Sequence, residues 1–522
     1  MQKFGPVNWT AHRPLALWLL PAQRLAIEYA PWFAGVYLIT LAIYSYLYTQ
    51  LIFTNHTFPN AWIYPYPSFN TFYAGRWFAD IVILLGGRSG AQALEFAVAS
   101  AIQVGNAFIF ASLLGVRKSW LILLFGLFLA LHPAFFDYYS FHVDHISFVL
   151  GDTLALVGVV TLSKIDRLRI SVPLAIACFV LSLAIHQPKV ALIATLLLIW
   201  LLETAQKETP ARTARNVLIA AVVYLVTLAI YYLSAKMTVS LEGFRNEINS
   251  SAEVLHQLQA AYAQTYLNFT SRVDYLPAHL QLLPAACIVA GFISILVYSS
   301  AVSASSALIS IGLLLAIPVA LQFSYIINDQ TWTNSGRILT SHAYVLLFLI
   351  ACGLRLGLLR PVVLCMSIGL IYFFGVVAAQ ETNAAAFKNI FDVAKVNRIV
   401  SRIETVVPDL YSGKRFQLII AGELPFEPQR FKRYKNSLYK SQFSTETLIA
   451  YRHVEIINFF LGREVVRQPD RSAIAQFEAS APFRLPWPAT ESVYVIGDDI
   501  IAILLQPYSK EIPITWDETR DE

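Results

Sequence analysis

The stretch 141–152, FHVDHISFVLGD, places two histidines and two aspartates between long apolar runs. Asp144 lies at the predicted mouth of a membrane span, where an ionisable side chain is a functional candidate by default. A carboxylate there can take the proton of an attacking hydroxyl group. The alternative is an aspartate that water solvates or that caps the following helix. For Asp152, two turns deeper, we favour a buried hydrogen bond to a neighbouring span.

Three basic residues in apolar surroundings are candidate phosphate ligands, because charged donors form strong hydrogen bonds with phosphate oxygens. They are Arg76 in AGRWFAD, Lys189 in IHQPKV and Arg337 in NDQTWTNSGRILTSH. Each also has a simpler interpretation. Arg76 can pair with Asp80 four residues later on one helix face, Lys189 can snorkel to the interface, and Arg337 can pair with Asp329 or a lipid headgroup.

Aromatic residues follow the first predicted span, among them Trp62, Tyr64 and Trp77. Their faces can stack on a sugar ring, or they form an ordinary aromatic belt at the membrane interface. The histidines His132, His142 and His145 lie close to Asp144 in sequence and together could bind a divalent metal, but H-x-D-H is not a recognised metal-binding spacing. A divalent metal is an open alternative, and we predict no cofactor.

Composition shows which elements must position these residues. The chain has 522 residues, of which 57% are hydrophobic and 14% charged, and its mean hydropathy is +0.57. These values indicate a polytopic membrane protein, and the net charge of +5 is too small to indicate a nucleic-acid partner. The four cysteines all fall in apolar segments, which predicts buried thiols and not disulfides. We expect no cleavable signal peptide, because Pro and Arg interrupt the first residues.

Apolar runs predict about eleven membrane helices, each near the length that a bilayer requires. Basic residues gather before the first predicted span and after the second, fourth, sixth and tenth, which predicts a cytoplasmic N-terminus and an outward C-terminus. Asp144, Lys189, Arg337 and nine of the ten histidines then lie in or beside outward-facing segments. The predicted spans are 31–53, 91–115, 119–135, 146–163, 170–186, 190–203, 217–235, 280–300, 305–326, 342–356 and 361–380.

The sequence predicts three parts: a cytoplasmic segment 1–30, a transmembrane domain 31–380 and a small α/β domain 381–522 outside the membrane. Two outer loops, 54–90 and 236–279, are too long for simple turns. The run FADIVILL in the first predicts an interfacial helix, and SSAEVLHQLQAAYAQTYL in the second predicts an amphipathic helix that begins at a serine. In the tail, RFQLIIAGE and SVYVIGDDIIAILLQ predict strands.

The order of four motifs resembles the Gtr type II family of membrane glucosyltransferases and, more broadly, GT-C glycosyltransferases. The stretch AGRWFAD is similar to a Gly-Arg and Ala-Asp motif after the first outer loop. HPAFFDYYSFHVDHISFVLG (132–151) places Asp144 on the family's aspartate. LAIHQPKVAL (183–192) is similar to a Tyr-Gln turn, with His186 replacing the tyrosine and Gln187 retained. SGRILTSHAY (335–344) places Arg337 on a late arginine.

The resemblance implies a GT-C-like fold in a bacterial inner membrane and a transfer reaction at the periplasmic face. A hexose, with glucose expected, would move from a polyprenyl-phosphate donor to an envelope glycan such as O-antigen or lipopolysaccharide. It assigns catalytic candidates Asp144, His56 and Asp80, phosphate-binding candidates Arg337, Lys189 and Arg76, and sugar- or acceptor-binding candidates Trp62, Tyr64, Trp77 and Gln187.

One departure from the family leaves other functions open. GT-C enzymes generally place a catalytic acidic residue in the first outer loop, where this chain has Asn55 and His56. The His56 imidazole has a suitable pKa for a base, and Asp80 and Asp144 are the alternatives. A non-catalytic relative would explain the lost acidic residues. A lipid-linked glycan transporter or flippase would place charged residues along a path through the membrane.

Overall fold

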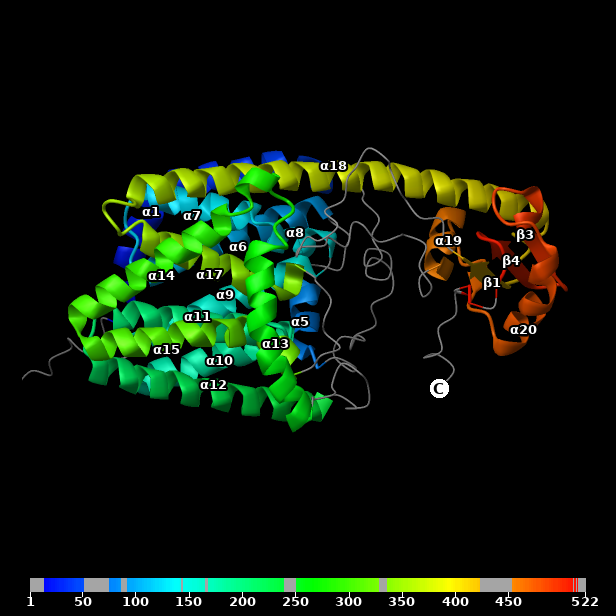
Figure 1. The fold of residues 1–522 in the computed structure, drawn as a ribbon. Coiled ribbons are helices and arrows are strands. Elements are labelled where there is room, and N and C mark those ends of the chain that lie inside the picture. Colours follow the sequence, from blue (N-terminus) through cyan, green and yellow to red (C-terminus); the bar gives the residue numbers. More distant parts are fainter. Residues whose placement is uncertain are drawn as a thin grey trace, which may run out of the picture.

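The computed structural model describes residues 14–50, 75–85, 92–141, 144–164, 168–238, 250–327, 336–422, 453–509, 511–512 and 514. Five residues singled out above lie outside these ranges: His56, Trp62, Tyr64, His142 and Asp329. The described part is mostly helical and consists of a bundle joined by one long helix to a small domain with a sheet (Figure 1).

The bundle contains long helices packed side by side, with shorter ones at one end (Figure 1). The long helices, in chain order, are α1 (Pro14–Ile43), α6 (Gln92–Leu113), α7 (Ser119–Leu131), α9 (His145–Leu162), α10 (Leu168–Ile185), α11 (Lys189–Ala205), α12 (Pro210–Thr238), α14 (Leu283–Val302), α15 (Ala304–Leu321), α17 (Thr340–Gly353) and α18 (Arg360–Val406). The other elements, all short except the 20-residue α13, are α2 (Ser45–Thr49), α5 (Trp77–Leu85), α8 (Pro133–Phe136), η2 (Asp137–Ser140), α13 (Ser251–Thr270), η4 (Ala278–Leu280), α16 (Phe323–Ile327) and η6 (Gly336–Ile338).

Every predicted span overlaps one of these helices. Within the described residues, seven helices are long and apolar enough to cross a membrane, or eight if α7 and the segment Pro133–Tyr139, bent by 49°, form one broken span. Large apolar side chains are exposed on several of them, such as Leu218 and Leu225 on α12 and Leu308 on α15. Such a surface suits lipid and not water. The structure therefore supports a helical polytopic membrane protein, and the number eleven stays a prediction.

Helix α17 forms the centre of the bundle, because all of its residues from Thr340 to Gly353 are buried. It lies close to α14 at Gly291, where an added Cβ atom would be 2.6 Å from the Leu349 carbonyl oxygen. A small residue at this position lets the two helices approach closely, as is common between membrane helices. The closely packed centre fixes the ends of the surrounding helices relative to one another.

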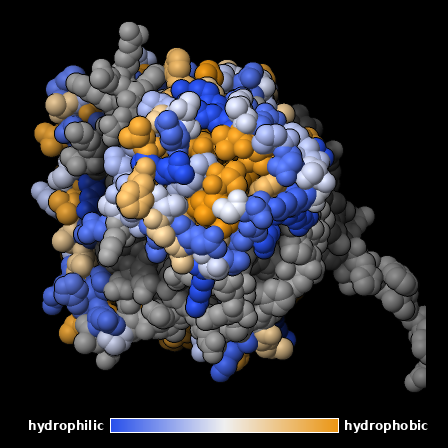
Figure 2. Space-filling model, turned by 90° about the vertical axis from the view of Figure 1, so that its right-hand side faces the viewer, coloured by the Kyte–Doolittle hydropathy of each residue, from blue (hydrophilic) through white to orange (hydrophobic). Residues whose placement is uncertain are grey.

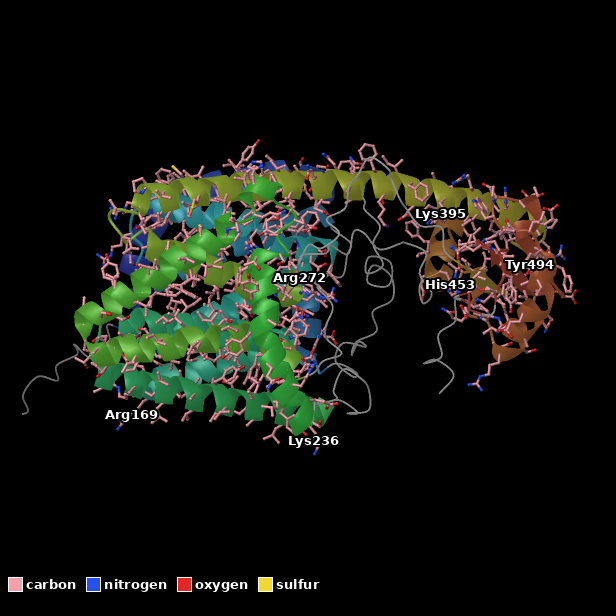
Figure 3. All side chains as sticks on the ribbon, in the orientation of Figure 1. Arg169, Lys236, Arg272, Lys395, His453 and Tyr494 are labelled. Carbon is pink, nitrogen blue, oxygen red and sulfur yellow. The ribbon has the colours of Figure 1, made fainter. Side chains whose placement is uncertain are left out.

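The short helices and the small domain lie at the same end of the bundle. Helices α5, α8 and α13 are at the end from which α18 continues to the small domain (Figure 1). Arg169, in a connection predicted to be cytoplasmic, lies at the opposite end from Lys236 and Arg272, which border and lie within the predicted second outer loop (Figure 3). The connection predicted to be cytoplasmic and the loop predicted to be outer thus lie at opposite ends of the bundle, and which end faces the cytoplasm stays a prediction.

The small domain is built on a four-stranded sheet in the order β2-β1-β4-β3. Its strands are β1 (Phe416–Ala421), β2 (Val466–Arg467), β3 (Val493–Ile496) and β4 (Ile500–Leu504), with β1 parallel to β2 and β4, and β3 antiparallel to β4. Helices α19 (His453–Leu461) and α20 (Arg471–Ser480) and the short turns η8 (Ala481–Phe483) and η9 (Thr490–Ser492) accompany the sheet. The end face of this domain shows an apolar area among hydrophilic residues (Figure 2).

Several local predictions are confirmed. The strands β1, β3 and β4 coincide with the two tail segments predicted as strands, and α5 covers FADIVILL. Helix α13 begins after Ser250, whose side chain and Glu253 form a capping box. The predicted boundary at residues 380 and 381 falls inside α18, which runs without a break into the core of the small domain through Val396, Ile399 and Ile403.

Candidate functional site

Four segments far apart in sequence meet at the end of the bundle that faces the small domain. Helix α5 packs against α9 and α10, and η6 packs against α8 and η2. Gly336 allows the second approach, because an added Cβ atom would be 2.6 Å from the Ala134 carbonyl oxygen. These contacts place Arg76, Asp144, Gln187 and Arg337 around one region at this end of the bundle.

Asp144 is half-buried at the N-cap position of α9. Its side chain makes no capping hydrogen bond with the described backbone of the helix, so the capping interpretation fails. Burial raises the pKa of Asp144 to about 6, while the positive charges of Arg76 and Arg337 lower the pKa and the negative charge of Asp80 raises it. Asp144 is therefore mostly ionised at neutral pH but easily protonated, as a proton acceptor in a reaction must be.

Arg76 connects α5 to the turn between α10 and α11. Its Nε atom donates a hydrogen bond to Gln187 Oε1 at 3.0 Å. The Tyr231 hydroxyl donates to the Gly75 carbonyl at 3.5 Å, and Trp77 Nε1 donates to Ser234 Oγ at 3.3 Å, so α12 also holds α5. The predicted sugar-binding residues Trp77 and Gln187 thus both help to position α5 and its arginine.

Arg337 is held by the segment that precedes Asp144. Its backbone N–H donates to Asp137 Oδ2 at 3.2 Å, and its guanidinium lies 3.7 Å from the same oxygen. The guanidinium carbon also lies 4.3 Å from the centre of the Phe141 ring. One guanidinium nitrogen, NH1, is buried and has no hydrogen-bond partner among the described residues. Arg337 can therefore still donate hydrogen bonds to an anion.

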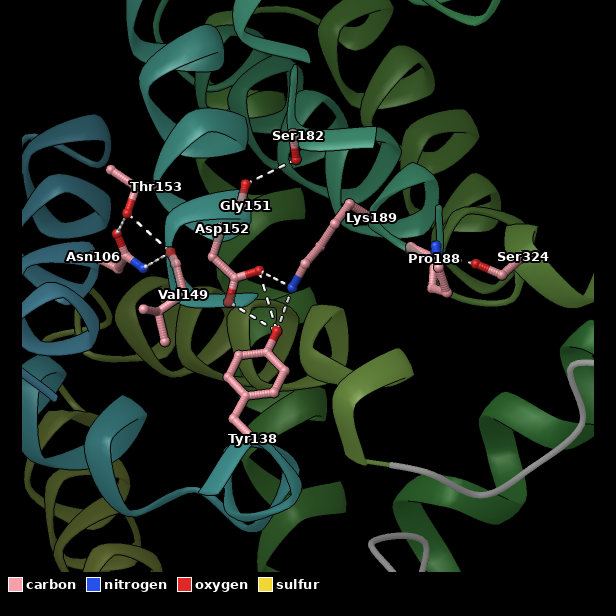
Figure 4. Close-up of polar contacts among 10 residues, drawn as sticks. All are labelled: Asn106, Tyr138, Val149, Gly151, Asp152, Thr153, Ser182, Pro188, Lys189 and Ser324. Atoms are coloured by element: carbon pink, nitrogen blue, oxygen red, sulfur yellow. Dashed lines mark hydrogen bonds and ion pairs between the residues drawn. The ribbon is translucent and has the colours of Figure 1, made fainter. Parts of the chain in front are cut away.

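Lys189, predicted to bind a donor phosphate, instead pairs with a buried aspartate, and this assignment is corrected. It is 1% exposed, and its Nζ atom donates to Asp152 Oδ1 and to the Tyr138 hydroxyl (Figure 4). Asp152 is fully buried, and its Oδ2 atom accepts a hydrogen bond from Tyr138 at 3.1 Å. Removing one member from such a pair leaves an uncompensated charge. The lysine therefore pairs with Asp152 and is not free to bind phosphate.

The buried hydrogen bond favoured for Asp152 is thus confirmed, and it joins three elements. Tyr138 belongs to η2, Asp152 to α9 and Lys189 to α11. Around this pair, Ser182 Oγ donates to the Gly151 carbonyl at 2.8 Å, and Asn106 Nδ2 donates to the Val149 carbonyl at 3.0 Å (Figure 4). The pair therefore fixes the start of α9, where Asp144 lies, relative to the turn that carries Gln187.

Two of the three histidines that lie close to Asp144 in sequence, His132 and His145, are within the described residues. His132 Nδ1 accepts a hydrogen bond from the Ala134 N–H at 3.1 Å, and His145 packs against the Tyr139 ring at 4.7 Å. In the described part of the chain, no group of three or more His, Cys, Asp or Glu residues is arranged to hold a metal ion.

His186 differs from these histidines, because its Nδ1 atom is buried and has no hydrogen-bond partner among the described residues. Burial lowers its pKa, and the charges of Arg76, Lys189 and Arg337 act in the same direction. His186 is therefore a neutral imidazole beside the arginines that surround Asp144.

The structure adds one carboxyl group that the sequence reasoning missed. Glu95, in the first turn of α6, is 5% exposed and lies within electrostatic reach of Asp144. The signal in the sequence was a lone acidic residue at the start of the predicted span 91–115. As with Asp144, an ionisable side chain in such a place is a functional candidate. Asp80, in the first turn of α5, is 3% exposed and also acts on Asp144.

The resulting arrangement can bind an anion beside a carboxylate of raised proton affinity. Arg76 and Arg337 supply the positive charge, and Asp144 supplies the proton acceptor. No protein-family model, no curated protein and no solved structure matches the chain.

The buried pair predicts a specific pattern of stability. Asp152→Asn and Lys189→Met should each lower the free energy of unfolding by about 3–5 kcal/mol, because each leaves one buried charge without its partner. The double variant should recover most of the loss. Unfolding of purified protein in mixed micelles, followed by circular dichroism, measures this. Additive losses in the double variant would contradict a direct interaction between the two side chains.

The raised pKa of Asp144 predicts pH-dependent anion binding. Below pH 6 the carboxyl group is protonated and no longer repels an anion near the two arginines, whereas above pH 6 it is ionised. Sulfate affinity should therefore fall roughly tenfold as pH rises through this range, if the repulsion is about 1.4 kcal/mol. Sulfate-induced stabilisation against heat at several pH values measures the affinity.

Two variants serve as controls for the sulfate experiment. Asp144→Asn should show a smaller decrease in sulfate affinity with rising pH than wild-type protein, and Arg337→Ala should bind sulfate weakly throughout. A decrease of undiminished size in Asp144→Asn would show that Asp144 is not responsible.

Proposed function

We propose that the protein is a membrane glycosyltransferase that moves a hexose from a polyprenyl-phosphate donor to a hydroxyl group of an envelope glycan. The observation that carries this proposal is the position of Asp144, a half-buried carboxyl group within electrostatic reach of Arg76 and Arg337 at one end of an apolar helix bundle. Glycosyl transfer from a lipid phosphate needs both functions in one place, a base for the acceptor and cations for the departing phosphate.

The residues take separate roles in this reaction. Asp144 accepts the proton of the acceptor hydroxyl as its oxygen bonds to the anomeric carbon. The bond between that carbon and the donor phosphate oxygen breaks, and its electron pair leaves with the lipid phosphate. Arg337 and Arg76 bind the phosphate through charge-assisted hydrogen bonds. The NH1 nitrogen of Arg337 lies 3.7 Å from Asp137 Oδ2 but makes no hydrogen bond with the described residues, which favours this role.

Three predicted site residues lie outside the described structure, and their roles stay proposals. His56 is an alternative base, and Trp62 and Tyr64 are candidates for stacking on the sugar. Asp80 is another alternative base, but its position in the first turn of α5 and its effect on Asp144 also suit a residue that tunes the charge of the site. Of the acidic residues in the described part of the site, Asp144 is half-buried, whereas Asp80 and Glu95 are almost fully buried.

The same proposal places the protein in a bacterial inner membrane with about eleven spans, each near the length that a bilayer requires. The site and the small domain lie at one end of the bundle (Figure 1), which we assign to the periplasmic side. There the small domain is available to hold the glycan acceptor.

Two other functions deserve a test: a non-catalytic relative that binds envelope lipids, and a transporter or flippase for lipid-linked glycans. A transporter generally has a substrate site near the middle of the membrane. The charged pair at depth here, Lys189 and Asp152, is satisfied internally. The Arg337 nitrogen that makes no hydrogen bond with the described residues lies instead near the end of the bundle, which favours an enzyme acting at the membrane surface.

Transfer of radiolabelled hexose from a polyprenyl-phosphate donor, in inverted and right-side-out vesicles, tests the proposal. Wild-type protein should transfer hexose at the periplasmic face. Asp144→Asn should reduce the rate at least a hundredfold, as loss of a general base does, and Arg337→Ala should weaken donor binding. His56→Ala distinguishes the two base candidates.

Two variants at exposed positions are matched controls, Asp409→Asn in the small domain and Arg169→Ala at the opposite end of the bundle. Both should leave transfer unchanged. No transfer by correctly folded wild-type protein with several donor sugars and an acceptor-bearing membrane would overturn the assignment in favour of a non-catalytic relative.

A further inference from the structure

Glu95 is a buried acidic side chain that the roles assigned above do not use. It is 5% exposed, and its Oε2 atom is buried without a hydrogen-bond partner among the described residues. The rings of Phe96 and His145, which follow Glu95 and Asp144 in the sequence, have their centres 5.8 Å apart where α6 packs against α9, so Glu95 lies within electrostatic reach of Asp144. An ionised carboxylate is costly in such a place unless a cation or several donors compensate it. Glu95 is therefore either protonated, or ionised only when a bound cation or hydrogen-bond donors compensate its charge.

The surroundings of the two carboxyl groups decide which of them keeps a proton. Asp144 is more exposed, and the charges of Arg76 and Arg337 favour its ionised form. Within the described residues Glu95 makes no ion pair or hydrogen bond, and only the N-terminus of α6 favours its charge. That helix contribution is about 0.3–2 kcal/mol, which is less than the several kcal/mol needed to desolvate a carboxylate. The proton therefore belongs on Glu95.

In the described part of the chain, no lysine or arginine is among the groups that pack around this turn of α6. The packed elements are α1, α2, α7 and α9, together with η2. Helix α7 contributes no titratable side chain between Ser119 and Leu131. The remaining elements contribute titratable side chains around Phe96 and Ala97, which follow Glu95. These side chains are Tyr37, Tyr44, Tyr48, Tyr139, His145 and Asp144.

We propose that Glu95 is the second carboxyl group of the site and forms with Asp144 a coupled pair that carries a single negative charge at neutral pH. Glu95 holds the proton and Asp144 is the ionised partner. Ionisation of Glu95 places a second negative charge beside the anion site and weakens anion binding. The pair thus sets both limits of the pH range in which the site is active, and Glu95 acts as a positioning residue through Asp144.

The effect of Glu95 on transfer depends on the proposed function, whereas the coupling does not. As pH rises, transfer should first increase as Asp144 loses its proton and then decrease as Glu95 loses its own. Such a pair titrates in two steps that belong to both groups together. Glu95→Gln keeps an uncharged side chain of the same shape, so it should retain the rise on the acidic side and lose the decrease on the alkaline side.

Isotope-edited infrared spectroscopy of the full-length protein in lipid nanodiscs tests the coupling without any transfer. With ¹³C-labelled glutamate, wild-type protein should show at neutral pH a protonated carboxyl band that Glu95→Gln lacks. In Asp144→Asn, the same band should disappear at a pH lower by about one unit or more, because the repulsive charge is gone. Ser100→Ala, a change at another buried α6 residue, should leave the band unchanged.

Two outcomes would overturn the proposal. One is the absence at neutral pH of any protonated band that depends on Glu95, and the other is a Glu95 band whose titration Asp144→Asn does not move. Either result could coexist with normal hexose transfer, which would leave the proposed function intact. A confirmed coupling in a protein that transfers no sugar would refute the function and keep the carboxyl pair.

Discussion

The site depends on the buried interaction of Lys189 with Asp152 and Tyr138. It joins α11, α9 and η2 at a depth where water cannot replace a missing partner. Charges in such surroundings interact far more strongly than at a surface, so the three elements have little freedom to separate. The start of α9, with Asp144, and the turn with His186 and Gln187 are fixed as a consequence. The positions of the more exposed charges follow from this internal pair.

The other polar groups around this fixed pair have incomplete hydrogen bonding, which suits a binding site. Arg337 is held by Asp137 and Phe141, but its NH1 nitrogen makes only a 3.7 Å ion pair with Asp137 and no hydrogen bond with the described residues. His186 likewise keeps a buried nitrogen unpaired within the same part of the chain. Unsatisfied polar atoms are costly in a folded protein, and they are found where a ligand completes the hydrogen bonding.

The sequence predicted the membrane class, the helices near every expected span, α5, the cap of α13 and the strands of the tail, because periodicity and capping are local properties. It also singled out Asp144, Arg76, Gln187 and Arg337, which the structure brings to one end of the bundle. The role of Lys189 was wrong, because a lysine in an apolar turn looks the same whether it binds a ligand or a buried aspartate 37 residues away. Glu95 was missed because its approach to Asp144 depends on the packing of α6 against α9.

A cryo-electron microscopy map of the protein in lipid nanodiscs with a polyprenyl-phosphate hexose bound would show directly whether Arg76, Arg337 and Asp144 form the donor site. We expect density for the phosphate between Arg76 and Arg337, with the sugar beside Asp144. Phosphate density at the opposite end of the bundle, near Arg169, or within the middle of the membrane would contradict it.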